Sequence, residues 1–294
     1  MIDNRKNLPL AWLILITLTI VWGSSFILIK RGLDHFDAGE VGALRMFAAS
    51  IVLMPLALKH IRNFTKHQYF HLFIVGFIGS FLPAFLFAKA ETGLSSAMAG
   101  VLNALTPVFV IIIGGLFYGQ KFTLRTGAGI FIGFVGTVLL MLAGTSLQSL
   151  SLNFFAIFIL LATICYGLNV NIIKYKLHGI PAIPLTSMAF TLILPFAAIY
   201  LFGFSDFMSK VQSNPDVWIS VFYLSLLGVV GTAAAMVLFN KLIQFISPVF
   251  ASSVTYLIPI VAVIWGLLDG EVLLLQHYIG MVIILVGVYI TNRK

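Results

Sequence analysis

The sequence predicts an all-α membrane protein whose ten transmembrane helices form two inverted five-helix repeats. Three observations support this prediction: a strongly apolar composition, charge-free runs long enough to cross a bilayer, and a residue pattern that occurs twice. Hydrophobic residues make up 61% of the 294 positions, charged residues only 9%, and the mean hydropathy is +1.10. Soluble domains carry about 25% charged residues. The chain therefore belongs in a lipid bilayer.

The candidate spans are apolar runs between charged or Gly/Pro-rich breaks. About 20 apolar residues suffice for one helical span, and a single charge-free run extends from Thr126 to Ile173. In chain order, the first five spans are expected near residues 10–31, 40–58, 70–90, 96–118 and 126–144. The second five are expected near residues 153–174, 182–203, 217–240, 249–268 and 274–291.

The basic residues of the loops are distributed unevenly. With the N-terminus in the cytoplasm, twelve of the 17 Lys and Arg residues fall on the inner side and four on the outer side, and Arg45 lies within a span. This bias sets the orientation of membrane proteins, so we expect both termini in the cytoplasm. It also explains the net charge of +8 without nucleic-acid binding. The outer four are Lys30, Arg31, Lys89 and Lys210.

A short motif in the first span returns in the sixth. Trp22-Gly23 corresponds to Tyr166-Gly167, and Ser25 corresponds to Asn169. Later positions match at one constant separation: Gly76, Gly79, Lys89, Ser95 and Pro107 with Gly228, Gly231, Lys241, Ser247 and Pro259. We therefore expect one repeat at residues 8–144 and a second at 153–292. Because five is odd, the second repeat crosses the membrane in the opposite sense, as in secondary transporters.

Several segments resemble the EamA-type family of the drug/metabolite transporter superfamily. They are WGSSF, LSSAMAGVLNALTPVFV, ISPVFASSVTYLIPIVAVIWG and the Gly270-Glu271 pair ahead of HYIGMVIILVGVYI. The resemblance covers nearly the whole chain. It implies a ten-helix permease of the bacterial inner membrane, commonly an exporter of amino acids or other small metabolites. The first repeat departs from the pattern, since Gln120 stands where the second repeat has Glu271.

The matched prolines predict breaks in two helices. A helical proline frees the carbonyl four residues earlier, which is that of Asn103 for Pro107 and that of Thr255 for Pro259. Non-helical backbone at membrane depth is tolerated only against protein or a wet cavity. We therefore expect Asn103 and Thr255 to line a substrate cavity, with a packed kink as the alternative.

The repeated motif supplies further candidates for substrate binding. Trp22 and Ser25 share one helix face, as do Tyr166 and Asn169. An aromatic ring beside a polar group suits a solute with an apolar body and a few hydrogen-bonding groups, and Tyr256 could support the same apolar body. The alternative is an interfacial aromatic beside a close-packing small residue. Asn171 lies off this face, where a helix–helix hydrogen bond is expected.

Arg45 is the basic residue that lies clearly within a predicted span. Charge at membrane depth is costly and suggests function. We expect a gating or structural role, with Glu40 or Asp37 as partner, and direct substrate contact is the alternative. No Asp or Glu lies at the middle of a predicted helix, and no cluster of cations does. Organic cations and phosphorylated solutes are thus disfavoured, and neutral or zwitterionic metabolites remain.

The sequence suggests neither an enzyme nor a metal or cofactor site. The six histidines lack metal-ligand spacing, and Cys165 is the only cysteine. We expect an exporter that works by alternating access, as a monomer or homodimer, with a passive facilitator or channel as the alternative. A membrane scaffold or receptor is a third class.

The charge bias predicts a topology that reporter fusions can test. Fusions after Lys66, Lys176 and Lys294 should read as cytoplasmic, and those at Gln148 and Gln212 as external. A cytoplasmic signal at Gln148 would contradict the ten-helix arrangement.

Overall fold

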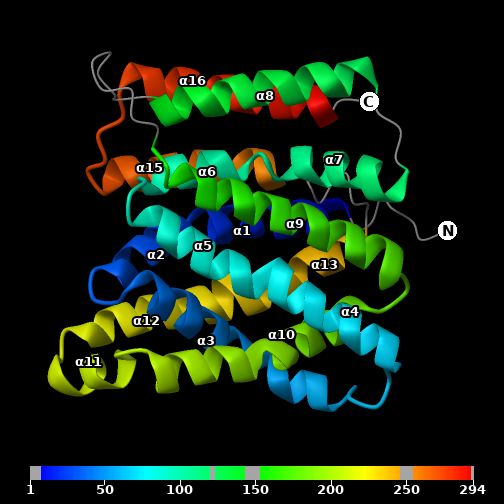
Figure 1. The fold of residues 1–294 in the computed structure, drawn as a ribbon, viewed down its shortest axis with the longest axis vertical. Helices are drawn as coiled ribbons and strands as arrows, with labels where there is room; N and C mark the ends of the chain where they lie inside the picture. The colour runs from blue at the N-terminus through cyan, green and yellow to red at the C-terminus, as the bar shows by residue number, and fades with distance from the viewer. Residues whose placement is uncertain (1–7, 120–122, 143–152, 246–253, 293–294) are drawn as a thin grey trace.

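The computed structural model describes residues 8–119, 123–142, 153–245 and 254–292. All regular elements within these ranges are helices, and most run roughly along one direction, horizontal in Figure 1. Seven helical stretches are long and apolar enough to cross a membrane: Pro9–Leu33, Ala38–Leu58, Lys66–Glu91, Ser96–Tyr118, Ala156–Lys176, Ala182–Phe204 and Val217–Leu242. Three shorter apolar helices are Leu124–Leu139, Leu257–Leu268 and Leu275–Ile290. The predicted all-helical membrane fold is confirmed, and each of the ten expected spans has its helical stretch.

Several spans consist of more than one helical segment. The first half of the chain contains α1 (Leu8–Gly23), α2 (Ser25–Leu33), α3 (Ala38–Leu58), α4 (Lys66–Gly76), η1 (Phe77–Phe81), α5 (Leu82–Glu91), α6 (Ser96–Asn103), α7 (Thr106–Tyr118) and α8 (Leu124–Leu142). The second half contains α9 (Ala156–Lys176), α10 (Ala182–Ile199), η2 (Tyr200–Phe204), α11 (Phe207–Ser213), α12 (Val217–Gly228), η3 (Val229–Ala234), α13 (Ala235–Phe245), α15 (Val254–Leu268) and α16 (Leu275–Asn292).

Two of the segment boundaries are π-helical turns at matching places in the two halves. The turn η1 follows Gly76 and contains Gly79, and the turn η3 follows Gly228 and contains Gly231. These glycines are the ones that match between the repeats in the sequence. A π-helical turn inside an α-helix is rare and often marks a functional site, so the repeated sequence pattern places the same irregularity in two helices.

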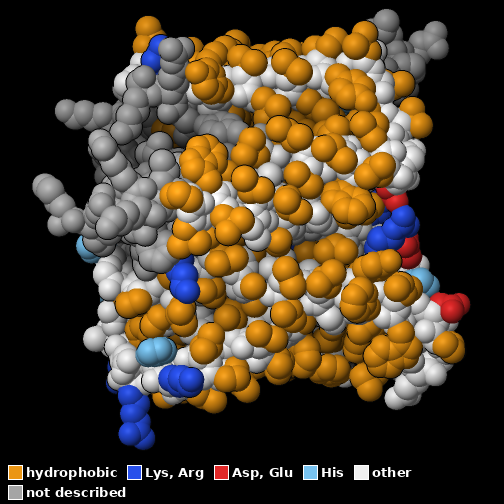
Figure 2. Space-filling model, turned by 180° about the vertical axis from the view of Figure 1, so that it is seen from behind, with side chains coloured by type: hydrophobic (Ala, Val, Ile, Leu, Met, Phe, Trp, Pro, Cys, Tyr) orange, Lys and Arg blue, Asp and Glu red, His pale blue; other side chains and the backbone are white. Residues whose placement is uncertain are grey.

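Charged side chains separate toward the two ends of the molecule. In Figure 2 the visible Asp and Glu side chains lie at the right edge beside some Lys, Arg and His side chains, while the left side shows Lys, Arg and His without acidic side chains, and apolar side chains cover the surface between the two. We call the first the acidic end, which holds Asp34, Asp37, Asp206, Asp216, Asp269 and Glu271, and the other the basic end. The apolar belt between the ends matches a membrane-spanning body.

The helices α8 and α16 lie side by side at the top of Figure 1 and pack through glycines. A Cβ atom added to Gly287 would lie 2.3 Å from the backbone nitrogen of Gly133, and one added to Gly136 would lie 2.7 Å from that of Ile284. In lipid, helices associate largely through close contacts of this kind. The glycines at these positions of the fifth and tenth spans therefore permit the close packing of the two helices.

This contact predicts opposite effects of two alanine substitutions. Gly287→Ala should destabilise the protein by about 1–3 kcal/mol, because the new methyl group has no room beside α8. Gly127→Ala is the matched control, since a Cβ there meets nothing within 4 Å. It should be neutral or stabilising, because alanine favours a helix over glycine by about 1 kcal/mol. Thermal unfolding in detergent measures both, and equal melting temperatures for the two variants would contradict the packing.

Candidate functional site

A cavity of about 160 Å³ lies between helices from both halves of the chain. It is lined by Trp22, Ser25, Phe26, Ile29, Arg45, Met46, Gly79, Ser80, Phe87, Asn103, Thr106, Tyr166, Asn169, Val170, Gly231, Thr232, Met236, Phe239, Thr255 and Ile258. Six of the seven predicted substrate-binding residues are among them. The seventh is Tyr256, whose side chain lies outside the described part of the structure. The lining is mostly apolar with a few polar groups, which is typical of small-molecule sites.

The first copy of the repeated motif joins α1 and α2 to two helices of the second half. A Cβ on Gly23 would lie 2.4 Å from the side chain of Val261 in α15, so only glycine permits this approach. Trp22 donates its indole N–H to the carbonyl of Gly231 in η3 at 3.1 Å. The hydroxyl of Ser25 lies 3.3 Å from the place of a Cβ on Gly231. The motif therefore holds the first span against η3 at the wall of the cavity.

The second copy makes the corresponding contacts with the first half. A Cβ on Gly167 would lie 2.9 Å from the carbonyl carbon of Phe109 in α7, and one on Gly79 in η1 would lie 2.3 Å from the side-chain Cγ of Asn169. Tyr166 packs against Phe87 with ring centroids 6.0 Å apart. The aromatic–glycine–polar pattern thus serves in both halves to bring a helix against a π-helical turn.

Asn169 and Asn171 have different surroundings although they are two residues apart. Asn171 donates its amide to the carbonyls of Val110 in α7 (2.9 Å) and Gly167 (2.8 Å), which confirms the expected helix–helix hydrogen bond. Asn169 lines the cavity, and its Oδ1 is buried with no hydrogen-bond partner among the described residues. A buried polar atom without a partner is costly, so Asn169 is available to a ligand.

The predicted helix break is present at Pro107, whereas the break predicted at Pro259 is wrong. The span that contains Pro107 is divided, because α6 ends at Asn103 and α7 begins at Thr106. The carbonyl of Asn103 accepts a hydrogen bond from the Thr106 hydroxyl at 2.8 Å, so this freed carbonyl already has one partner. Pro259 instead lies inside the continuous helix α15.

The expected pairing of Arg45 with Glu40 or Asp37 is wrong. Glu40 accepts from the backbone N–H of Asp37 and from Lys210, whose Nζ lies 2.5 Å away. Asp37 in turn accepts from the N–H of Glu40, which completes a capping box at the start of α3. Arg45 is five residues further along, on a different face of the helix. Its side chain lines the cavity and donates through Nε to the hydroxyl of Thr232 at 2.9 Å.

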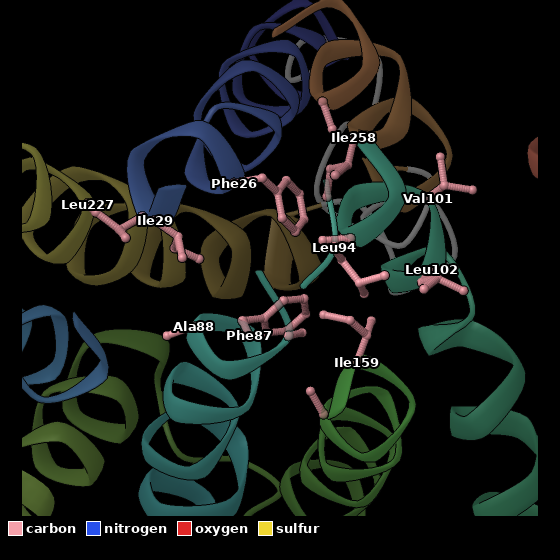
Figure 3. Close-up of a cluster of buried hydrophobic side chains, with 14 of the residues drawn as sticks. Phe26, Ile29, Phe87, Ala88, Leu94, Val101, Leu102, Ile159, Leu227 and Ile258 are labelled. Carbon is pink, nitrogen blue, oxygen red and sulfur yellow. The ribbon is translucent and has the colours of Figure 1, made fainter. Parts of the chain in front are cut away.

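A cluster of apolar side chains fills the space between the cavity and the acidic end. Figure 3 shows that labelled residues of α2, α5, α6, α9, α12 and α15 gather in one apolar cluster. Phe26 and Phe87, whose ring centroids are 5.9 Å apart, border both the cavity and this cluster. Leu102 and Ile159 of the same cluster are completely buried. From this packing we infer that the cavity is closed toward the acidic end.

An ion-pair network lies beyond this cluster, at the acidic end itself. Lys30 of α2 contacts Asp269 at 2.6 Å and Glu271 at 3.1 Å, and Arg31 also contacts Asp269. Glu271 accepts the backbone N–H groups of Ser96 (2.8 Å) and Ala97 (3.2 Å) at the start of α6. The carboxylate therefore joins helices of the two halves and neutralises a helix N-terminus.

The Lys30–Asp269 contact of this network persists over the physiological pH range. The hydrogen bond from Lys30 holds the pKa of the Asp269 carboxyl below its ordinary value of 3.8. A carboxyl whose folded-state pKa is lowered stabilises the fold above its ordinary pKa, and this stabilisation is lost as the pH falls through the lower value. The Lys30–Asp269 contact therefore weakens only in strong acid.

Glu91 is a buried acidic residue that the sequence did not reveal. It is the last residue of α5, yet it is only 7% exposed. Its Oε2 accepts from the Ser96 hydroxyl at 3.3 Å, and its Oε1 has no partner among the residues that the structure describes. Burial here comes from α6 folding over the end of α5, and no local sequence signal predicts that contact.

A smaller cavity leads from the central one toward the basic end. It shares Ser80, Asn169 and Met236 with the central cavity. Its wall includes Asn240, which donates to the hydroxyl of Thr186 at 2.8 Å.

Within residues 8–119, 123–142, 153–245 and 254–292, the recorded ion pairs all lie at the acidic end. Among the described residues, ion pairs thus lie at the acidic end, and the Asn240–Thr186 hydrogen bond lies on the way to the basic end. In the same ranges no group of three His, Cys, Asp or Glu side chains could hold a metal ion.

The fold and the cavity define a multi-pass α-helical membrane protein with an internal cavity between its two halves. The model of the EamA-like transporter family matches the chain twice, at residues 9–142 and 153–293. The chain belongs to the EamA-like transporter family, and it is a membrane transporter rather than an enzyme. The double match indicates that its two halves are duplicates.

Several proteins are similar to the chain along nearly its whole length. An uncharacterized transporter of Archaeoglobus fulgidus is 24% identical and covers 96% of the chain and 99% of the relative. The uncharacterized inner membrane transporter YedA of Escherichia coli is 28% identical, with 98% and 92% covered. A solved crystal structure with 14% sequence identity superimposes with a TM-score of 0.59 and covers 95% of each chain. The last comparison shows a shared fold.

The closed acidic end predicts a sided labelling pattern for the cavity. In a Cys165→Ser background, Asn169→Cys should react with a membrane-impermeant thiol reagent applied at the basic end, and slowly or not at all from the acidic end. Cysteines at the other cavity positions should behave alike: Trp22, Ser25, Asn103, Tyr166 and Thr255. Phe131→Cys, which is 67% exposed on the lipid-facing surface of α8, should stay unlabelled.

The same assay tests the ion-pair network. Glu271→Gln should increase labelling of Asn169→Cys from the acidic end, because the neutral amide no longer pairs with Lys30. Asp34→Asn is the matched control, since Asp34 is half exposed and, among the described residues, pairs with Arg31 alone at 3.7 Å. Equal labelling from both ends in the parent protein would contradict a closed acidic end.

Proposed function

We propose that the protein is a secondary transporter that exports small neutral or zwitterionic metabolites, such as amino acids, by alternating access. The observation that carries this proposal is the enclosed cavity, which both halves line with residues matched in the sequence. Trp22 and Ser25 of one half and Tyr166 and Asn169 of the other supply aromatic faces and polar atoms. A cavity built from two related halves can open at either end when the halves exchange conformations.

The proposed setting is the bacterial inner membrane, with both termini in the cytoplasm and the acidic end outside. The Lys and Arg bias of the loops supports this orientation, and the relative YedA is named an inner membrane transporter. The division into repeats at residues 8–144 and 153–292 belongs to the same proposal. It is supported by the matched π-helical turns η1 and η3.

The unequal ends support an alternating cycle rather than a permanently open pore. Opening toward the acidic end requires Lys30 to leave Asp269 and Glu271, and α6 to lose its carboxylate partner. Lys174 corresponds to Lys30 in the sequence, and Gln120 corresponds to Glu271. Because glutamine carries no charge, these two residues cannot form the equivalent ion pair. A passive channel or facilitator, the second candidate, would not need a charged closure on one side.

Transport of labelled solutes tests the proposal directly. Purified protein in proteoliposomes should catalyse saturable counterflow of at least one labelled amino acid or small neutral metabolite, because a carrier exchanges solute through one occluded site. Flux that neither saturates nor responds to solute on the opposite side would favour a channel.

Substrate charge and the role of Asn169 give a second test. Expression should relieve growth inhibition by one or more amino acids or uncharged metabolites, but not by quaternary ammonium dyes, since no carboxylate lines the described cavity. Asn169→Ala should weaken this relief with little loss of stability, because its side chain has no hydrogen bond within the described residues. Asn171→Ala is the matched control and should lower stability by about 1 kcal/mol or more, since it removes a buried interhelical bond. Strong resistance to quaternary cations would contradict the substrate class.

A further inference from the structure

Arg45 is the one charged side chain among the described residues that line the cavity. The other polar groups of the lining are hydroxyls, amides and an indole, and no carboxylate is among them. Guanidinium groups stay protonated in proteins. The described cavity wall thus carries a single permanent positive charge.

The guanidinium of Arg45 makes a hydrogen bond through Nε, whereas Nη1 and Nη2 have no partner among the described residues. Its Nε donates to the Thr232 hydroxyl at 2.9 Å, and that hydroxyl donates to the carbonyl of Leu227 at 3.0 Å. These two consecutive hydrogen bonds, through Thr232 of η3 to Leu227 of α12, fix the orientation of the guanidinium plane. Its Nη1 and Nη2 groups form neither a hydrogen bond nor an ion pair with any residue that the structure describes. Two parallel donors therefore remain for a ligand.

The acidic residues that could neutralise Arg45 have other partners or lie too far away. Glu40 is taken by Lys210. Glu91 has an electrostatic effect on Arg45 but no ion-pair contact with it, and its carboxylate accepts a hydrogen bond from Ser96 instead. A charge held at membrane depth without a contacting counter-charge is costly. A ligand with a negative group would remove most of that cost, so the empty cavity favours an anionic group at this position.

The chemistry of the site selects a carboxylate. The planar Nη1/Nη2 pair matches the two oxygens of a carboxylate in a bidentate contact. A phosphate would require further cations, and the cavity offers none among its described residues. Phe26, Phe87 and Phe239 with the methionines Met46 and Met236 form the apolar part of the wall. The geometry fits a small molecule with one carboxylate and an apolar body.

We propose that Arg45 binds the carboxylate of the transported molecule through Nη1 and Nη2. The substrates are small monocarboxylates: α-amino acids and analogues that lack the amino group. This inference rests on the proposed transport function and narrows its substrate class, because it excludes uncharged solutes. The amino group is dispensable, since no carboxylate of the described lining faces it, and the carboxylate is essential.

Binding to the purified, full-length protein tests the proposal. The probes are the common amino acids, their amides and the corresponding deaminated acids, such as leucine, leucinamide and 4-methylpentanoate. The readout is the ligand-induced rise in melting temperature at millimolar concentration. At least one amino acid and its deaminated acid should raise it, and the matching amide should not. An equal rise with acid and amide would overturn the proposal, and so would the absence of any rise with every carboxylate.

Variants of Arg45 separate binding from a structural role. Arg45→Gln should weaken carboxylate binding by about 30-fold or more, which is the usual effect of removing one partner of a buried charge pair. Arg45→Lys should retain part of the affinity because it keeps the positive charge, and it should lose the rest because lysine cannot make the bidentate contact. The melting temperature of ligand-free Arg45→Gln should equal or exceed that of the parent, because a costly charge is removed. A lower melting temperature with unchanged affinity would assign Arg45 a structural role instead.

Counterflow then distinguishes this proposal from the proposed function. If labelled leucine and leucinamide exchange equally well, the transport function stands and the role of Arg45 is wrong. If carboxylates bind in an Arg45-dependent way but no solute is exchanged, the binding site stands and the transport function is wrong.

Discussion

The arrangement of the whole protein depends on the close approach of helices at positions where no side chain fits. Gly23 and Gly167 let the first and sixth spans reach α15 and α7, and Gly79 and Gly231 admit Asn169 and Ser25 to the π-helical turns. In a membrane the hydrophobic effect does not drive helices together, so association relies on such contacts and on hydrogen bonds. A methyl group at Gly23, Gly79 or Gly167 would displace the facing helix or side chain and distort the cavity, whereas one at Gly231 would press only on the Leu227 and Ser25 side chains. The cavity exists because its walls meet at glycines.

The closure of the acidic end combines two kinds of interaction that act at different depths. The rings of Phe26 and Phe87 pack next to the cavity, where water is excluded. Lys30 with Asp269 and Glu271 lies at the surface, where the carboxylate side chains are 8% and 5% exposed but the lysine is 35% exposed. A partly exposed ion pair contributes little stability, yet it is specific in geometry and can separate without leaving a charge in hydrocarbon. Apolar packing thus excludes solute, and the ion pairs set which helices move apart together.

The sequence predicted the spans and six of the residues that line the cavity, because both leave local signals. Hydropathy marks a span, and the repetition of Trp22-Gly23 as Tyr166-Gly167 marked a shared wall. The partner of Arg45 was predicted wrongly, because Glu40 is nearer in sequence but serves a capping box on another helix face. The burial of Glu91 and the turns η1 and η3 were not predicted. Glu91 is covered by another helix, and a π-helical turn has no composition of its own, so both depend on tertiary contacts that one sequence does not display.

The charge of Arg45 has a consequence for the transport cycle if it binds the substrate carboxylate. An empty carrier must enclose an uncompensated guanidinium whenever both ends are closed, and a loaded carrier encloses a neutral pair. Enclosure is therefore easier with substrate than without it, because the desolvation cost of the arginine is offset only by the bound anion. Exchange of one monocarboxylate for another should be faster than net export, in which the empty protein has to return. Arg45 would then make the return of the empty carrier the rate-limiting step of net export. It would also couple closure of the cavity to the presence of a bound carboxylate.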